Sequence, residues 1–143
     1  MNVETILKAK GRAVVTIAPD ATISEAVELL RQKGIGAVVV SDDGIRIGGI
    51  LSERDIVHAL AERGARTLQL EVATLMTRHV YSCRPDDTVA DLMAEMTLRR
   101  IRHLPVVENG RLSGIISIGD VVKSRLDEVE AEASSLRQFI TSA

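Results

Sequence analysis

Two short motifs, Ser52-x-x-Asp55 and Ser117-x-x-Asp120, each place a hydroxyl and a carboxylate three residues apart. Each follows a glycine-containing apolar segment and precedes apolar residues at helical spacing. A carboxylate can accept hydrogen bonds from both hydroxyls of a vicinal diol. The beginning of a helix offers backbone N–H groups and a positive dipole end to a phosphate. The motif is also a variant of the capping box, so helix capping is the structural alternative.

The two motifs occupy equivalent places in a tandem repeat. Thr22 aligns with Thr88, an offset of 66 positions, and after one extra residue in the first copy Ser52 aligns with Ser117, an offset of 65. A repeat of this length predicts one supersecondary unit used twice, each copy covering the other's apolar face. We therefore expect a pseudo-twofold arrangement in which clefts come in equivalent pairs.

Each copy predicts the order β-α-β-β-α, so the expected fold class is α/β (α+β). In the first copy Thr22 and Glu25 form a capping box and Gly34 ends the helix. The first copy is expected to contain strands at 14–17, 37–40 and 45–51, and helices at 22–34 and 52–64. The second is expected to contain strands at 80–83, 104–107 and 112–116, a helix that begins at 88, and a final helix that begins near 117. The predicted domains are 1–64, a linker at 65–78, and 79–143.

This order and its motifs resemble the CBS domain, used twice as a Bateman module. In the second copy the resemblance rests on Met76-Thr77, on Ile101-Arg102-His103-Leu104-Pro105-Val106 and on Gly114-Ile115-Ile116-Ser117-Ile118-Gly119-Asp120. The string from 102 to 120 is similar to small stand-alone bacterial CBS-pair proteins. The first copy departs from the pattern, with Gly36-Ala37 where the second has Arg102-His103. If the basic pair matters, the two clefts differ in chemistry.

The resemblance implies that adenine nucleotides bind between the repeats, with the Asp of each motif on the ribose and the Ser near the sugar and phosphate. AMP is the leading ligand, followed by ATP, ADP and NAD(H), and no other cofactor is required. A partner protein, which the sequence does not name, would read a ligand-dependent shift between conformations. One cleft is expected to combine Val14, Val15, Ile35, Gly36 and Ala37 with Arg102, Ser117 and Asp120. The other is expected to combine Thr77, Tyr81, Ile101 and His103 with Ser52, Arg54 and Asp55.

Several basic residues could serve a phosphate or remain solvated. Arg102 lies at the entrance of a predicted strand, and the planar fork of an arginine matches phosphate oxygens. His103 is expected to form hydrogen bonds there, and Arg54 to approach the phosphate or pair with a neighbouring carboxylate. Lys10 belongs to a basic segment before the first strand that is either solvated or lines the first cleft.

Composition excludes several other functions. The formal net charge is -2 and the aromatic residues are Tyr81 and Phe139, so neither bulk attraction to nucleic acid nor base stacking is expected. The sequence shows no signal peptide and no apolar run long enough for a membrane. The lone Cys83 is expected in the core of a reduced, cytoplasmic protein. The three histidines lack zinc-ligand spacing, so no metal site is expected.

The sequence shows no nucleophile–base pair that would indicate catalysis. We therefore expect a protein that is not an enzyme, and nucleotide turnover is the least favoured alternative. A structural oligomerisation module with empty clefts is the other alternative.

The final helix continues beyond its first-copy equivalent and carries an extra apolar stripe at Leu126, Val129, Leu136, Phe139 and Ile140. Apolar stripes of this kind mark interfaces, which predicts a homodimer.

Overall fold

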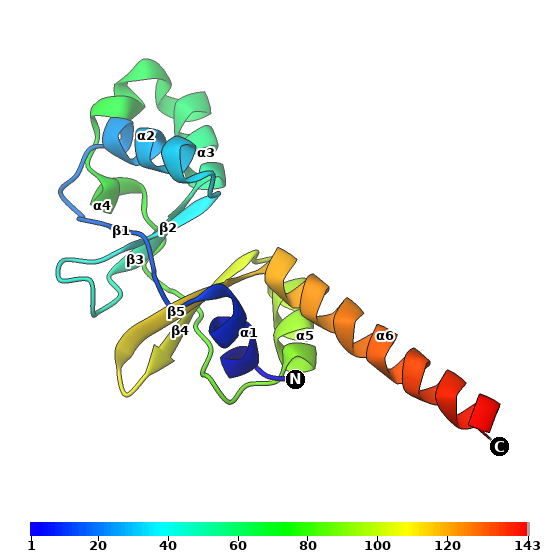
Figure 1. The fold of residues 1–143 in the computed structure, drawn as a ribbon. Helices are drawn as coiled ribbons and strands as arrows, with labels where there is room; N and C mark the ends of the chain where they lie inside the picture. Colours follow the sequence, from blue (N-terminus) through cyan, green and yellow to red (C-terminus); the bar gives the residue numbers. More distant parts are fainter. Residues whose placement is uncertain (143) are drawn as a thin grey trace. The chain divides into compact units, whose positions relative to one another are not determined.

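The computed structural model describes residues 1–142, which form two compact units (Figure 1). The first-repeat unit contains residues 13–81 and 108–113. The second-repeat unit contains residues 1–12, 82–107 and 114–142. Each unit is built around one copy of the repeat, in agreement with the expected α+β class.

The first-repeat unit is a three-stranded sheet covered by helices. Its strands are in the order β1-β2-β3, with β1 parallel and β3 antiparallel to β2. The elements are β1 (Thr16–Ile17), α2 (Ile23–Lys33), β2 (Ala37–Val40), β3 (Gly49–Ser52), α3 (Glu53–Arg63), the 3₁₀ helix η1 (Gly64–Gln69) and α4 (Val72–Leu75).

The capping signals predicted for this unit are confirmed. The Thr22 hydroxyl accepts a hydrogen bond from the Glu25 N–H, and the Glu25 carboxylate accepts one from the Thr22 N–H. Gly34 ends α2 in the left-handed conformation that glycine tolerates. All four residues of β2 are buried, which explains its continuous apolar run, and Val38 and Leu51 join the core of the unit.

The second-repeat unit repeats this plan with two helices that differ in length from their counterparts. Its elements are α1 (Val3–Lys10), α5 (Val89–Arg99), most of β4 (His103–Glu108), the second half of β5 (Arg111–Ser117) and α6 (Ile118–Ser142), while the hairpin tip at 108–113 is counted with the first-repeat unit. Strands β4 and β5 form a two-stranded sheet, joined through Asn109 and Gly110. Both residues have positive φ, as a tight primed hairpin turn requires.

Strand pairing confirms the repeat at the level of register. Ile17 pairs in parallel with Val40 in the first-repeat unit, and Cys83 pairs in parallel with Val106 in the second. Both residues of the second pair lie 66 positions after those of the first. The same residues of each copy therefore form the same sheet contact.

The segments that precede the two copies are exchanged between the units. Residues at the N-terminus pair with the second copy: the Val3 N–H donates to the Asp87 carbonyl, and the Val89 N–H donates to the Met1 carbonyl. In the first-repeat unit, the Val72 N–H donates in the same way to the Ala21 carbonyl. The lead-in of the first copy thus completes the second, and the linker completes the first.

The irregular parts of the chain differ from the sequence-based expectation. No element was predicted for the basic lead-in, which forms α1 because Asn2 caps a helix whose buried face is Val3, Ile6 and Leu7. The linker contains η1 and α4. The strand expected at 45–51 begins only at Gly49, the strand expected at 14–17 begins at Thr16, and the strand expected at 80–83 is reduced to one bridge at Cys83.

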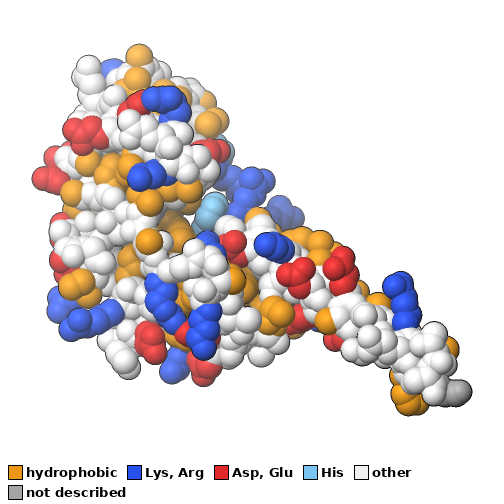
Figure 2. Space-filling model, in the orientation of Figure 1, with side chains coloured by type: hydrophobic (Ala, Val, Ile, Leu, Met, Phe, Trp, Pro, Cys, Tyr) orange, Lys and Arg blue, Asp and Glu red, His pale blue; other side chains and the backbone are white. Residues whose placement is uncertain are grey.

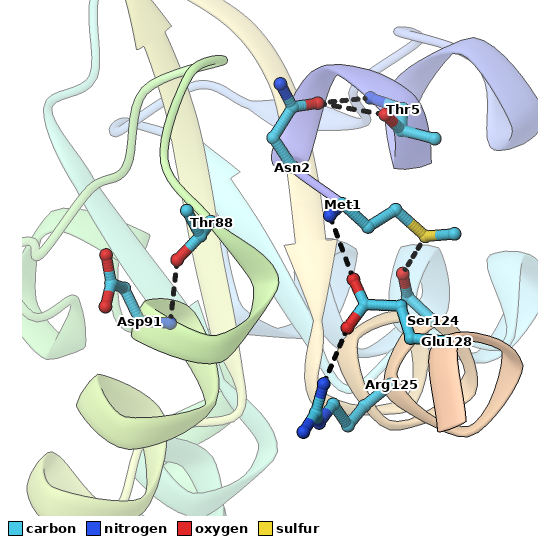
Figure 3. A network of polar contacts seen from close by, with 8 residues as sticks. All are labelled: Met1, Asn2, Thr5, Thr88, Asp91, Ser124, Arg125 and Glu128. Carbon is cyan, nitrogen blue, oxygen red and sulfur yellow. Dashed lines mark hydrogen bonds and ion pairs between the residues drawn. The ribbon is translucent and has the colours of Figure 1, made fainter. Parts of the chain in front are cut away.

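Helix α6 is attached to the second-repeat unit along its first turns only. Val121 and Ser124 are buried there. The Glu128 carboxylate lies 3.0 Å from the Met1 amino group and 2.8 Å from the Arg125 guanidinium (Figure 3). Beyond this network the helix extends away from α1 and α5 of its own unit (Figure 1).

Candidate functional site

The first polar corner joins β3 to α3 through Ser52 and Asp55. The Ser52 hydroxyl accepts a hydrogen bond from the Asp55 N–H at 3.3 Å. The Asp55 Oδ2 accepts from the Ser52 N–H at 3.0 Å and from the Ser52 hydroxyl at 3.1 Å. This is a complete capping box, as predicted. Both side chains remain half-buried, so the corner is fixed in shape while still reachable from solvent.

The second polar corner joins β5 to α6, repeats the two backbone cap bonds of the first corner and adds one cation. The Asp120 Oδ2 accepts from the Ser117 N–H at 2.9 Å, and the Ser117 hydroxyl accepts from the Asp120 N–H at 3.1 Å. The Lys10 ammonium lies 2.7 Å from the same Oδ2 and also donates to the Ile115 carbonyl at 3.0 Å. The last residue of α1 is therefore bound to the carboxylate predicted for ligand contact.

The contacts of Asp120 determine its protonation. Burial raises the pKa of its carboxyl, but hydrogen bonds from Lys10 and Ser117, with the Lys10 charge, outweigh burial and lower the pKa overall. The side chain is 24% exposed. Asp120 is therefore ionised at neutral pH and able to accept hydrogen bonds.

In both corners the hydrogen bonds converge on Oδ2, so the second carboxylate oxygen is available. Within residues 1–142, no hydrogen bond ends on Oδ1 of Asp55 or Asp120. A carboxylate oxygen can accept two hydrogen bonds. Each corner therefore retains acceptor capacity for a hydroxyl-rich ligand after helix capping is satisfied.

Most N–H groups at the beginning of each helix already have partners. The Glu53 N–H donates to the Gly36 carbonyl at 2.9 Å, and the equivalent Ile118 N–H donates to the Arg102 carbonyl at 2.8 Å. These bonds bring the entrance of β2 to the first corner and the entrance of β4 to the second. They also place exposed Arg102 next to the Ser117 and Asp120 motif, whereas Gly36 brings no charge.

Thr77, another candidate residue of the first-repeat unit, pairs with the strand that leads into the first corner. The N–H of Thr77 donates to the Ile50 carbonyl at 2.8 Å, and the Ile50 N–H donates back at 3.0 Å. Thr77 and Arg54 are exposed. The Tyr81 ring makes an edge contact with His79, with 5.1 Å between ring centroids.

The apolar candidates belong to the walls of the two cores. Val15 and Ile35 pack against the first core, Ala37 is buried, and Ile101 packs against the second core. Val14, Gly36 and His103 are half-buried. Among the candidates, hydrogen bonds bring Gly36 to the first corner and Arg102 to the second, and the combination of residues across the repeats stays a prediction.

The position of Lys10 against Asp120 was missed by sequence reasoning, which left Lys10 either solvated or lining a cleft. The available signal was the N-cap Asn2 followed by apolar Val3, Ile6 and Leu7 at helical spacing, with Gly11 as the end. That pattern predicts a helix ending at Lys10. The long-range contact from 10 to 120 has no local signature.

Other chemistries find little support in the described part of the chain. No group of three or more His, Cys, Asp or Glu residues in residues 1–142 could hold a metal. Burial, with a smaller effect of Asp87, raises the pKa of the Cys83 thiol to about 12, which makes it a poor nucleophile. None of the described helices combines the length and apolar character needed to cross a bilayer.

The family model for the CBS domain matches this chain twice, at residues 10–62 and 72–127. The chain belongs to the CBS-domain family. Both matches include one Ser/Asp corner, so the two corners are equivalent parts of a tandem CBS pair. CBS-domain proteins are generally regulatory.

Solved CBS structures share this fold over almost their whole length. The CBS-domain protein ATU1752 from Agrobacterium tumefaciens is 51% identical, with a TM-score of 0.85 over 87% of this chain and 99% of that one. The CBS domain protein PAE2072 from Pyrobaculum aerophilum, solved with AMP, is 29% identical, with a TM-score of 0.73 over 84% and 89%. The CBS pair of protein MJ0100, solved with 5′-methylthioadenosine and S-adenosyl-L-methionine, is 27% identical, with a TM-score of 0.76 over 91% and 98%.

Proposed function

We propose that this CBS pair is a regulatory module that binds an adenine nucleotide at its Ser/Asp corners. The observation that carries the proposal is the doubled corner itself. In each copy an ionisable carboxylate is held by its cap through Oδ2 and keeps Oδ1 for a ligand. A lone capping box needs no further role, but two equivalent ones at the β-α junctions of a CBS pair fit a ribose diol.

The ligands of the structural relatives support an adenosine compound. AMP, 5′-methylthioadenosine and S-adenosyl-L-methionine, named with PAE2072 and MJ0100, all contain adenosine with its 2′ and 3′ hydroxyls. AMP is our leading ligand, and ATP, ADP or NAD(H) are the alternatives. We assign ribose recognition to Asp55 and Asp120, each beside its serine.

Phosphate recognition is assigned to the residues around the corners. Arg102 lies at the entrance of β4, next to the second corner, and exposed Arg54 lies in the first turn of α3. A guanidinium can bind phosphate oxygens through two parallel hydrogen bonds. Among the first amides of α3 and α6, those of Arg54 and Gly119 form no hydrogen bond within residues 1–142, so one N–H per corner is available.

The module acts, in this proposal, without catalysis. Nucleotide binding would stabilise one arrangement of the pair in the cytoplasm, and a partner protein would recognise that arrangement. A ligand shifts such an equilibrium only by its difference in affinity for the two states.

Thermal unfolding tests nucleotide binding directly. A ligand that binds only the folded protein stabilises it increasingly with concentration. We expect the melting temperature to rise with AMP and to rise less with 2′-deoxy-AMP, which lacks one hydroxyl for the carboxylate. No shift with AMP, ADP, ATP or NADH up to millimolar concentration would refute the proposal.

A second candidate function, favoured by one observation, is oligomerisation. Helix α6 leaves large apolar side chains exposed, including Leu136 at 60% and Phe139 at 73%. We propose that two chains associate through α6, whether or not nucleotide is bound. Light scattering should give about twice the 15.5 kDa of one chain at tens of micromolar. A monomer under these conditions, with and without AMP, would end this proposal.

A further inference from the structure

The apolar residues of α6 follow a heptad spacing through its free part. Successive members are separated alternately by four and three residues, which is the seam of a left-handed coiled coil. In heptad notation Leu126, Ala133 and Ile140 occupy a positions, and Val122, Val129 and Leu136 occupy d positions. At about 1.5 Å per residue, the seam from 122 to 140 runs for roughly 28 Å.

The seam is exposed over most of its length. Val122, Val129 and Ile140 are 42%, 45% and 64% exposed, while the buried Val121 and Ser124 attach α6 to its own unit by a neighbouring face. Hydrophobic and charged side chains both reach the surface along this helix (Figure 2). The seam is thus open to a partner without detaching α6 from its unit.

The charges beside the seam indicate which partner fits. In a parallel, in-register pair of helices, a g residue faces the e residue five positions later on the other helix. Arg125 in a g position would face Glu130, and Glu132 in the next g position would face Arg137. Both pairs are of opposite charge, and by symmetry each occurs twice in a dimer. Glu130, Glu132 and Arg137 form no salt bridge within residues 1–142, so their charges are available.

The antiparallel arrangement with the same seam length is disfavoured by the same charges. It pairs Leu126 with Leu136 of the second chain. Residues midway along the seam then lie opposite the same residues of the second chain. Glu130 would then face Glu130, Glu132 would face Glu132, and Lys123 would face Arg137. Like charges at these positions repel and are a means by which coiled coils exclude wrong pairings. Only the parallel register satisfies both the apolar seam and its flanking charges.

Other occupants fit the seam less well. From 122 to 142 the helix carries three basic and four acidic side chains, so an anionic membrane surface would not attract it. Within residues 1–142, the buried residues of α6 are Val121 and Ser124, which lie in its first turns. We propose that two copies of this chain pair their α6 helices as a parallel, in-register coiled coil over residues 122–140. This inference specifies the association suggested under Proposed function and is independent of nucleotide binding.

Charge variants of one g–e pair distinguish the two orientations. Glu132→Arg and Arg137→Glu each create like-charge pairs in the parallel dimer, so each alone should weaken association about tenfold, and mixing them should restore it. Both positions lie beyond the Arg125–Glu128 contact, so the unit itself is not altered. In the antiparallel dimer Arg137→Glu would face Lys123 and strengthen association. Sedimentation measurements that show strengthening, or no effect of either variant, would overturn the parallel coiled coil.

Cysteine crosslinking gives a geometric test with a matched control. Leu136→Cys at a d position should form an intermolecular disulfide on mild oxidation, because identical d positions face each other in a parallel pair. Gln138→Cys, at an f position opposite the seam, should not crosslink, and buried Cys83 stays unreactive in both. A disulfide only when Leu126→Cys and Leu136→Cys are mixed would establish the antiparallel arrangement and contradict the proposal. A chain that is monomeric at all concentrations would refute association as a whole, while leaving the nucleotide proposal untouched.

Discussion

The two Ser/Asp corners share the same two backbone cap bonds, yet within residues 1–142 only the second corner holds a cation. Oδ2 of Asp55 is bound by Ser52 alone, whereas Oδ2 of Asp120 is bound by Ser117 and by Lys10. The difference originates in the segments exchanged between the repeats. Helix α4 ends at Leu75, and the chain then pairs through the Thr77 backbone with Ile50.

Helix α1 is twice as long as α4, with eight residues against four, and it reaches the second corner with a side chain instead. The Ile115 carbonyl, equivalent to that of Ile50, accepts from the Lys10 ammonium. The position 66 residues after Lys10 is Met76, so the lead-in segment brings a cation to only one of the two equivalent corners in residues 1–142. Repeated motifs in one chain need not be equal sites.

The largest expected effect is the loss of ligand contact at either corner. Asp120→Ala and Asp55→Ala each remove a carboxylate that would accept two ribose hydroxyls, and bonds to charged groups contribute about 1.5–3 kcal/mol each. We expect calorimetric affinity for AMP to fall about tenfold or more at the altered corner, while the other corner still binds. Asp→Asn variants, which keep a capping oxygen, are the control for lost capping. If both alanine variants bound AMP with wild-type affinity at both corners, the two aspartates would serve only to cap their helices.

The glycines at the two corners are expected to differ in their tolerance of a methyl group. A Cβ on Gly49 would lie 2.9 Å from the Thr77 carbonyl oxygen, which is backbone, whereas a Cβ on Gly114 would meet only the Leu7 side chain, at 2.6 Å. Overpacking costs about 1–3 kcal/mol. Gly49→Ala should therefore lower the free energy of unfolding in denaturant more than Gly114→Ala. If Gly114→Ala instead lowered the free energy of unfolding more, the contact of Gly114 with Leu7 of α1 would be the more rigid one.

The contrast between Arg102 and Gly36 predicts unequal phosphate binding. Arg102→Ala should weaken AMP severalfold, by about 1 kcal/mol, and leave adenosine nearly unchanged, since a charge-assisted bond to phosphate would be lost. Competition binding with both ligands measures the difference. An equal loss of affinity for AMP and adenosine would show that Arg102 acts through packing or through contact with the base.

The smallest effect concerns the Lys10 contact. The pKa of Asp120 is lowered in the folded protein, so its ion pair stabilises the fold at pH above about 4, the unfolded value, and the gain disappears as pH falls through the lower folded pKa. Lys10→Met should cost at most about 1 kcal/mol at neutral pH, and the difference from wild type should shrink with acidification. In the Lys10→Met variant, NMR titration should show a pKa of Asp120 higher than in the wild-type protein, because the Lys10 hydrogen bond and charge are lost. An unchanged Asp120 titration would contradict the ion pair.

Sequence alone predicted the elements with strong local signals. The capping boxes, Gly34 and Gly64 as helix ends, the buried run of β2 and the doubled corner follow from residues within a few positions of one another. The exchanged lead-ins and the Lys10–Asp120 contact could not be predicted in this way, because they join segments about 50 to 110 residues apart through backbone bonds and one flexible side chain. Some strands are shorter than expected for a similar reason, because the pairing partner determines where the hydrogen bonds of a strand end.

The most direct test of the proposed ribose sites is a crystal structure of the protein grown with AMP. We predict that the ribose hydroxyls lie within hydrogen-bond distance of the carboxylate of Asp55 or Asp120, with that carboxylate still capping its helix through Oδ2. The phosphate should lie on the side of Arg54 or Arg102. AMP bound with its ribose away from both carboxylates would contradict the assignment.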